Sequence, residues 1–179
     1  MINKDYLTQW LGENATQEYQ KFFYKDGLMY ATNKFVLFIV KSFYDKRLEG
    51  CVANFEDVVL EENFFDYEKL FRIINHEQYK NVRVDYSLMK KILETHGEFA
   101  YVKIGDVDFE FKKNTVFKCI VDFMEHTGEK TMWVTKNNKM VYIKHNEEYG
   151  FFMPYLFTNI DPKIKYDTLD LKYEQHKLF

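Results

Sequence analysis

The sequence predicts an α+β protein made of short amphipathic helices and antiparallel strands. Three observations support this class. Apolar stripes of helical period alternate with short strand-like runs, turn-forming pairs separate these runs, and aromatic residues make up 19% of the chain, which suits a strand-rich core. The chain has 179 residues, 46% of them hydrophobic, which is enough for one domain with a buried core.

The first forty residues predict one helix followed by three strands. An apolar stripe indicates a short helix over 5–11. Strand-like runs follow at 17–24 and 28–41, and the Asp26-Gly27 pair between them is typical of a hairpin. A second turn at 32–34 divides the later run, so that three strands follow the helix.

The middle of the chain predicts helices between short strands. Residues 42–65 carry mainly loop signals, and Asp66 is the expected cap of a helix over 67–74. A strand at 82–84 precedes a helix over 86–95, which Asp85 begins. The predicted strands after this helix are 99–104 and 107–112, around a turn at Gly105-Asp106.

The last predicted helix covers 115–127, with Asn114 as its N-cap and Gly128 as its end. Three strands follow it, at 131–135, 140–145 and 149–156. The order of one helix and three strands therefore occurs twice, and we interpret the chain as repeated βαβββ units.

This interpretation sets the expected domain organisation. Residues 1–157 are expected to form the folded region, with 1–75 and 76–157 as candidate half-units. Residues 158–179 are expected to form a polar C-terminal tail that is extended or partly ordered.

Composition and charge exclude several classes of protein. The net charge of −3 argues against a generically basic nucleic-acid coat. The two cysteines make no disulfide framework, which fits a reducing cytoplasm as the expected location. We also expect the protein to act without a cofactor. The N-terminus lacks the apolar core of a signal peptide, and the longest apolar run is far short of a membrane span.

No catalytic or metal-binding motif stands out. The sequence contains no HExxH, CxxC, GxGxxG or GxxxxGK[ST] pattern. Asp106, Asp108 and Glu110 are expected on one face of a strand, which we interpret as a solvated face. The alternative is an enzyme that binds a divalent cation through these carboxylates.

Several lysines raise the question of a basic surface. They precede or lie on the outer faces of two predicted helices: Lys90, Lys91, Lys112, Lys113 and Lys118. Asp122 and Glu125 share the outer face of the second helix and would weaken its attraction for phosphate. The sequence is therefore compatible with two interpretations of these lysines: a DNA-binding surface and an ordinary surface of mixed charge.

Three segments together resemble the bacterial DNA polymerase sliding clamp. Residues 26–37 resemble the clamp hairpin that contains "ATDGH", although Asn33 replaces the usual Asp and the Gly-His pair is absent. Residues 65–70 and 82–93 resemble the "FPDY" stretch and the strand and helix after it. Residues 149–154 resemble the closing "Y-IMP" strand.

The resemblance implies a clamp-like fold, no enzymatic activity and a role in DNA replication or related DNA transactions. It makes the helices at 86–95 and 115–127 the inner helices, with Lys90, Lys91 and Lys118 facing the phosphates of double-stranded DNA. A homo-oligomer is also compatible with the resemblance, because the helices of the clamp family line a ring. The alternative is a clamp-fold adaptor or inhibitor, carried by a phage or mobile element, that binds proteins without touching DNA.

The extreme C-terminus resembles the short "QL-LF" peptide with which other proteins dock on bacterial clamps. Gln175, Leu178 and Phe179 match this pattern, while His176 replaces the usual Leu. Leu and Phe side chains suit an apolar pocket, and Gln supplies hydrogen bonds. The tail is therefore a candidate tether to a bacterial sliding clamp, and the alternative is that it folds back on its own domain.

Overall fold

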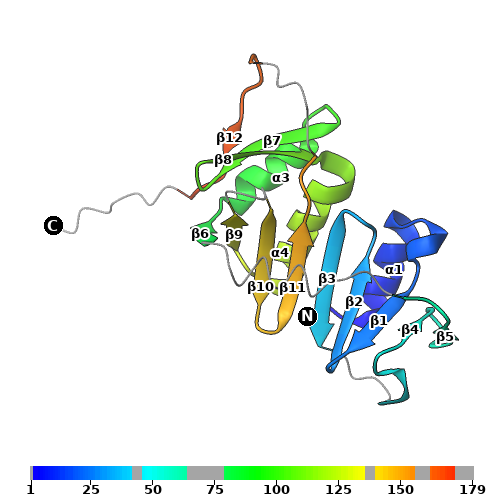
Figure 1. Ribbon diagram of the computed structural model, residues 1–179. Coiled ribbons are helices and arrows are strands. Elements are labelled where there is room, and N and C mark those ends of the chain that lie inside the picture. Colours follow the sequence, from blue (N-terminus) through cyan, green and yellow to red (C-terminus); the bar gives the residue numbers. More distant parts are fainter. Residues whose placement is uncertain (1, 42–45, 64–78, 136–139, 156–161, 172–179) are drawn as a thin grey trace.

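In the computed structural model, a long antiparallel sheet carries helices on one face, and a second, smaller sheet stands at one end (Figure 1). The structure describes residues 2–41, 46–63, 79–135, 140–155 and 162–171. Within these ranges the α+β class predicted from the sequence is confirmed. The predicted helix over 67–74 lies outside the described residues.

The helical elements are short. They are α1 (Lys4–Asn14), α3 (Tyr86–Glu94), α4 (Lys118–Thr127), the π-helical turn η3 (Lys113–Phe117) and the 3₁₀ turns η1 (Gln17–Tyr19) and η2 (Lys46–Leu48). Asp85 caps α3 as predicted, because its carboxylate accepts a hydrogen bond of 3.0 Å from the Leu88 N–H. Gly128 ends α4 in the left-handed conformation, also as predicted.

The start of α4 differs from the prediction. Asn114 does not cap this helix, because η3 runs directly into α4 and no side chain caps either start. The N-terminal strand prediction was also too long, since η1 occupies its beginning.

The large sheet joins two groups of strands in the order β5-β4-β1-β2-β3-β11-β10-β9-β6. The N-terminal strands are β1 (Phe22–Lys25), β2 (Leu28–Thr32), β3 (Val36–Lys41), β4 (Val52–Ala53) and β5 (Val59–Leu60). The others are β6 (Tyr79–Arg83), β9 (Thr131–Thr135), β10 (Val141–His145) and β11 (Glu148–Phe152). The two groups meet where β3 pairs with β11, with Phe38 opposite Gly150.

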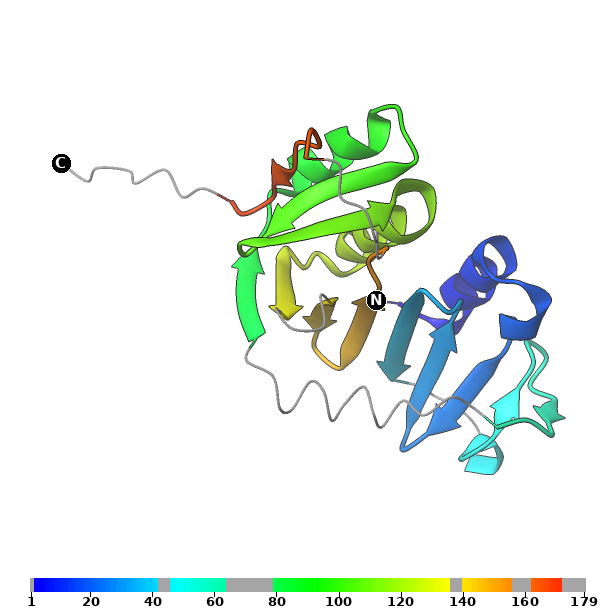
Figure 2. The ribbon, with the colours of Figure 1, turned by 45° about the horizontal axis from the view of Figure 1, so that its top comes forward.

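The smaller sheet contains β7 (Phe99–Ile104), β8 (Val107–Lys112) and β12 (Asp167–Thr168). Residues 162–171, expected in the polar tail, include β12, which pairs in parallel with β7 (Figure 2). Leu169 is fully buried, and its carbonyl accepts a hydrogen bond of 2.8 Å from the Asp85 N–H. The Leu171 N–H donates to the Arg83 carbonyl, so this segment connects the small sheet to the end of β6.

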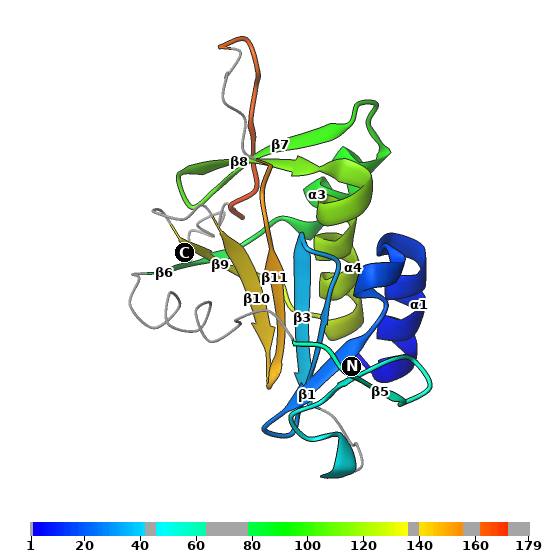
Figure 3. The same cartoon turned by 45° about the vertical axis from the view of Figure 1, so that its right-hand side comes forward.

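Alternation along the strands divides the apolar residues between the two faces of the large sheet. On β3, Val36, Phe38 and Val40 belong to the main core, whereas Leu37 and Ile39 belong to a second cluster. Because successive side chains point to opposite faces, these clusters lie on opposite sides of the sheet. The helices α1, α4 and α3 cover the main-core side (Figure 3).

Aromatic packing at Phe38 connects both groups of strands to the helices. The Phe38 ring meets Trp10 of α1 edge-on at 4.7 Å between ring centroids and stacks on Phe123 of α4 at 5.7 Å. It also meets Phe152 of β11 at 6.2 Å. This residue therefore lies at the point where α1, α4 and the β3–β11 pair converge.

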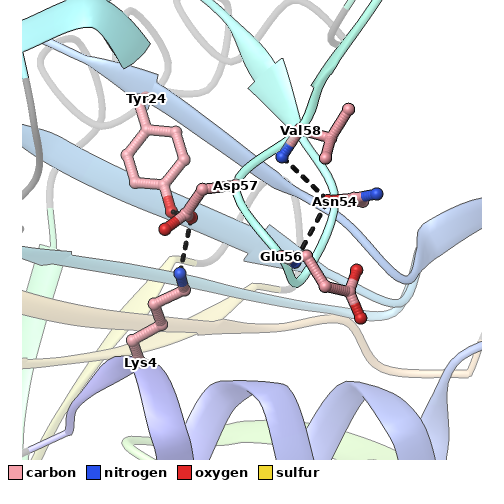
Figure 4. Close-up of polar contacts among 6 residues, drawn as sticks. All are labelled: Lys4, Tyr24, Asn54, Glu56, Asp57 and Val58. Carbon is pink, nitrogen blue, oxygen red and sulfur yellow. Dashed lines mark hydrogen bonds and ion pairs between the residues drawn. The ribbon is translucent and has the colours of Figure 1, made fainter.

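A polar loop fixes the beginning of α1 (Figure 4). Between β4 and β5, the Asn54 side-chain oxygen accepts hydrogen bonds from the N–H groups of Glu56 and Val58, at 3.0 and 2.9 Å. This turn presents the Asp57 carboxylate, which lies 2.5 Å from the Lys4 ammonium and accepts from the Tyr24 hydroxyl at 3.4 Å. The loop thus ties α1 to the edge of the large sheet.

Candidate functional site

The candidate site is the helix layer formed by α1, α3 and α4, because the predicted DNA-binding lysines lie on it or beside it. Lys90 and Lys91 are exposed on α3, and Lys118 is exposed on α4. These three side chains are placed where a ligand could reach them. Lys112 and Lys113 lie at the junction between β8 and η3 and have different surroundings.

Lys113 is buried and serves the fold. It is only 2% exposed. Its ammonium donates hydrogen bonds to the carbonyl and hydroxyl oxygens of Thr95, at 3.0 and 2.9 Å, and to the His96 carbonyl at 3.3 Å. A cation at the end of α3 is favourable because the last carbonyls of a helix lack partners within it. We therefore leave Lys113 out of any phosphate-binding surface.

Lys112 is half-buried, and its ammonium lies 5.6 Å from the centre of the Tyr155 ring. Tyr155 is placed by a hydrogen bond of 2.7 Å from its N–H to the Glu110 carbonyl. This arrangement puts Lys112 at the end of β8, the edge strand of the small sheet.

Tyr86 brings a further lysine to the helix layer. The ammonium of Lys90 lies 4.8 Å from the centre of the Tyr86 ring, and that of Lys130 lies 3.8 Å from it. Both distances are typical of cation–π contacts. Sequence reasoning missed Lys130 because this residue follows α4 in the chain and only the fold brings it to α3.

Carboxylates outnumber the available lysines on the helix layer. The helices α1, α3 and α4 carry five of them: Asp5, Glu13, Glu94, Asp122 and Glu125. The same helices carry four lysines, and one of these, Lys4, pairs with Asp57. With Lys130 included, four lysines outside that pair face five carboxylates, so the helix layer is net negative by one charge at neutral pH. Lys118 shares its helix with two of the carboxylates.

The three carboxylates considered as a metal site are separated by their partners. Asp106 lies in the β7–β8 turn, 3.0 Å from the Lys80 ammonium, and Asp108 lies 3.7 Å from that of Lys103. Glu110 is buried and accepts a hydrogen bond from the Tyr166 hydroxyl. Among the described residues, no group of three potential ligands is arranged to hold a metal ion.

The predicted partner-binding residues Gln175, Leu178 and Phe179 lie outside the described residues. Within the described part of the chain, none of the helices has the length and apolar character that crossing a membrane requires.

Comparison with solved structures places the fold. The chain is similar to the DNA polymerase sliding clamp from Caulobacter crescentus, with a TM-score of 0.58 and 8% sequence identity. It is similar to the DNA polymerase III subunit beta from Pseudomonas aeruginosa, with a TM-score of 0.56 and 9% identity, and to the sliding clamp of that organism with ligand, with a TM-score of 0.52 and 9% identity. The resemblance to a clamp fold predicted from short motifs is thereby confirmed.

Each of these matches covers 87% of this chain and 65% of the other chain. This chain therefore spans slightly less than two thirds of the length of the clamps it resembles. No protein-family model and no curated protein matches the sequence.

Proposed function

We propose that this chain is a non-enzymatic, clamp-fold binding module in DNA replication or related DNA transactions, and that its main partners are proteins. The observation that carries the proposal is the charge of the helix layer. In a clamp that encircles DNA, this layer faces the phosphates, and here five carboxylates outnumber the four lysines outside the Lys4–Asp57 pair, which are Lys90, Lys91, Lys118 and Lys130. A net negative surface repels a polyanion and lowers its rate of association.

The chemistry of the described residues supports a binding role. The buried cysteine, Cys119, is hydrogen-bonded within the core, and burial raises the pKa of its thiol to about 11. Such a thiol is a poor nucleophile at neutral pH. The three carboxylates of the β7–β8 hairpin each have a different partner, which supports a structural role for them.

The direct test is the affinity of the full chain for a fluorescent DNA duplex, measured by anisotropy at rising salt. We expect little binding even at about 50 mM salt, because few lysines would contact phosphate. The Lys90→Glu, Lys91→Glu double variant should behave like the parent chain. Tight binding that falls steeply with salt, and that this variant abolishes, would overturn the proposal.

That contrary outcome defines the second candidate function, weak binding of duplex DNA. One observation favours it: Lys90, Lys91 and Lys130 gather at the α3 side of the helix layer, two of them around Tyr86. In this case Lys130→Glu should weaken DNA binding as well, whereas Lys34→Glu, a matched charge change at an exposed residue of the β2–β3 turn, should not.

We also propose that a bacterial sliding clamp is one protein partner, held by the C-terminal residues Gln175, Leu178 and Phe179. The experiment is capture of the chain by an immobilised bacterial clamp. Deleting residues 175–179 should abolish capture, because Leu and Phe are the anchors of such peptides. Replacing only Lys177 by Ala is the control and should leave capture unchanged. Equal capture after the deletion would refute this tether.

Absolute mass in solution separates a ring from a binding module. A protein-binding module is expected to stay monomeric over a range of concentrations. A discrete closed oligomer, detected by light scattering, would instead favour a chain that encircles DNA.

A further inference from the structure

We propose that the groove between α1 and α4 binds the guanidinium group of an arginine side chain on a partner protein. The inference rests on the proposed function in one respect, that the partner is a protein, and it names the chemistry by which that partner is recognised. The groove has a volume of about 340 Å³, within the range of sites that hold small molecules or long side chains.

The groove lies between the two helices where α1 and α4 pack over β3. Trp10 contacts Phe38 of β3, and Phe38 in turn stacks on Phe123 of α4. Side chains from both helices line the groove. They are Tyr6, Gln9, Trp10, Glu13 and Asn14 from α1, and Lys118, Cys119, Asp122 and His126 from α4.

The floor of the groove is aromatic, and the indole of its most buried ring is already hydrogen-bonded. Trp10 and Cys119 are both buried, and the indole N–H donates to the Cys119 sulfur at 3.0 Å. Tyr6 is half-buried and meets the His126 ring edge-on, with 4.4 Å between the ring centroids. Because Trp10 is only 5% exposed, the rings most open to a ligand are those of the half-buried Tyr6 and the exposed His126, beside the charged groups of the groove.

The rim favours a cation. Its charged groups are two carboxylates, Glu13 and Asp122, and one ammonium, that of Lys118. The Glu13 carboxylate accepts a hydrogen bond of 3.0 Å from the Gln9 amide. The Asp122 carboxylate is half-buried, and among the described residues no hydrogen bond or ion pair within 4.0 Å engages it.

The surroundings of Asp122 compensate its negative charge only in part. Burial raises the pKa of its carboxyl group, and the nearby Glu125 raises it further. Lys118 and His126 act in the opposite direction without cancelling the effect of burial. A cation arriving in the groove would stabilise the ionised carboxylate, so ligand binding and ionisation of Asp122 would support each other.

A guanidinium suits this set of groups better than other charged ligands. It is planar, forms paired hydrogen bonds with a carboxylate and lies flat on aromatic rings. A lysine ammonium is a compact, strongly hydrated charge that gains less from the aromatic floor. A phosphate group would face two carboxylates and a single lysine, which disfavours it.

The first experiment titrates the isotope-labelled full chain with N-acetyl-L-arginine amide, followed by NMR. The probe is raised to about 50 mM, which covers the millimolar dissociation constants expected for one anchoring side chain. We expect saturable shifts confined to the Trp10 indole and to the amides of α1 and α4. N-acetyl-L-citrulline amide, neutral and of nearly the same shape, should give none. No saturable shift with the arginine probe, or equal shifts with both probes, would overturn the proposal.

Charge variants then locate the site. Asp122→Asn should weaken arginine binding about tenfold, since it removes a charge-assisted hydrogen bond. Glu125→Gln makes a similar charge change on the same helix outside the groove and should change the affinity less than about twofold. Lys118→Gln should tighten binding several-fold, because it removes the competing cation. If Asp122→Asn and Glu125→Gln weaken binding equally, the effect is a general one of charge and the site is refuted.

These results are separable from those of the DNA experiment. Arginine binding together with steeply salt-dependent DNA binding would refute the proposed function and leave the groove as a guanidinium site. Failure of arginine binding with no DNA binding would refute the groove and leave the proposed function standing.

Discussion

Two regions of the molecule have the same order of elements and are anchored in different ways. The α1 region, with strands β1–β3, and the α4 region, with strands β9–β11, each place one helix before three antiparallel strands. They meet where β3 pairs with β11. Five residues of α4 are buried, compared with three of α1, so α4 is the more deeply packed of the two helices.

The ends of these helices differ as well. Asn3 caps α1 by accepting a hydrogen bond of 2.9 Å from the Tyr6 N–H, and Lys4 ties the helix to Asp57. By contrast, α4 has no capping side chain and continues from η3, where the buried Lys113 holds the end of α3. The start of α1 is thus held by polar contacts at the surface, whereas the start of α4 is held by burial. Four predictions test this difference.

The largest effect is expected at Phe38, which both regions share. Phe38→Ala should lower the free energy of unfolding by about 3–5 kcal/mol, because it leaves a cavity among Trp10, Phe123 and Phe152. Urea unfolding followed by circular dichroism measures this change. Phe35→Ala is the control, since Phe35 is 49% exposed, and it should cost less than about 0.5 kcal/mol. Similar losses in both variants would contradict this role of Phe38.

The next effect concerns the buried lysine of the α4 region. Lys113→Met keeps the length of the side chain but leaves oxygens of Thr95 and His96 without their donor. We expect a loss of about 1–3 kcal/mol in urea unfolding. Lys118→Met changes the same residue type on the exposed face of α4 and should be nearly neutral. If Lys113→Met is stabilising, the desolvation cost of the ammonium outweighs its hydrogen bonds.

Alkaline pH should destabilise the protein through Cys119, which lies between the two helices. Burial raises the pKa of this thiol from 9.0 to about 11. The unfolded thiol therefore ionises first, so its contribution to stability is intact below pH 9 and declines as the pH rises toward 11. The slope reaches at most about 1.4 kcal/mol per pH unit.

The comparison between pH 8.5 and pH 10 in urea unfolding measures this decline. Cys119→Ala should lose less stability than the parent chain over that interval, whatever its stability at pH 8.5. Cys51→Ala is the matched control and should follow the parent. Identical declines in all three chains would show that the thiol does not contribute.

The smallest effect is expected at the cap of α1. Asn3→Ala should cost about 1 kcal/mol, because the Tyr6 N–H loses its partner. Asn114→Ala, at the position expected from the sequence to cap the last helix, should cost almost nothing, since Asn114 is exposed and caps neither η3 nor α4. Equal costs would remove the distinction between the two helix starts.

Much of the fold could be predicted from the sequence because its signals are local. The Asp26-Gly27 and Gly105-Asp106 pairs adopt positive φ at the two hairpins, and the Asp85 cap begins α3 where expected. The start of α4 could not be predicted, because η3 is stabilised by burial of Val116 and Phe117 in the assembled core. Local propensity favours an Asn cap there, and packing overrides it.

Less of the candidate site could be predicted from the sequence. Lys90, Lys91 and Lys118 are exposed as expected from their helical positions, because the opposite stripe of each helix is apolar. The role of Lys113 depends on Thr95 and His96, which precede a whole hairpin, and the contact of Lys130 with Tyr86 depends on how α3 and α4 pack. Such long-range contacts leave no periodic pattern in the sequence. The groove between α1 and α4 leaves none either.

The pairing of β3 with β11 has a consequence for how the chain folds. The hydrogen bond between Trp10 and Cys119 spans 109 residues, and the strand pair beneath it spans a similar stretch. During synthesis, the α1 region therefore emerges long before β11 exists. Until then, the edge of β3 that pairs with β11 stays without a partner strand. Folding dominated by such distant contacts is slow, so the early hairpin of β2 and β3 needs protection from association with other chains until the last strands are made.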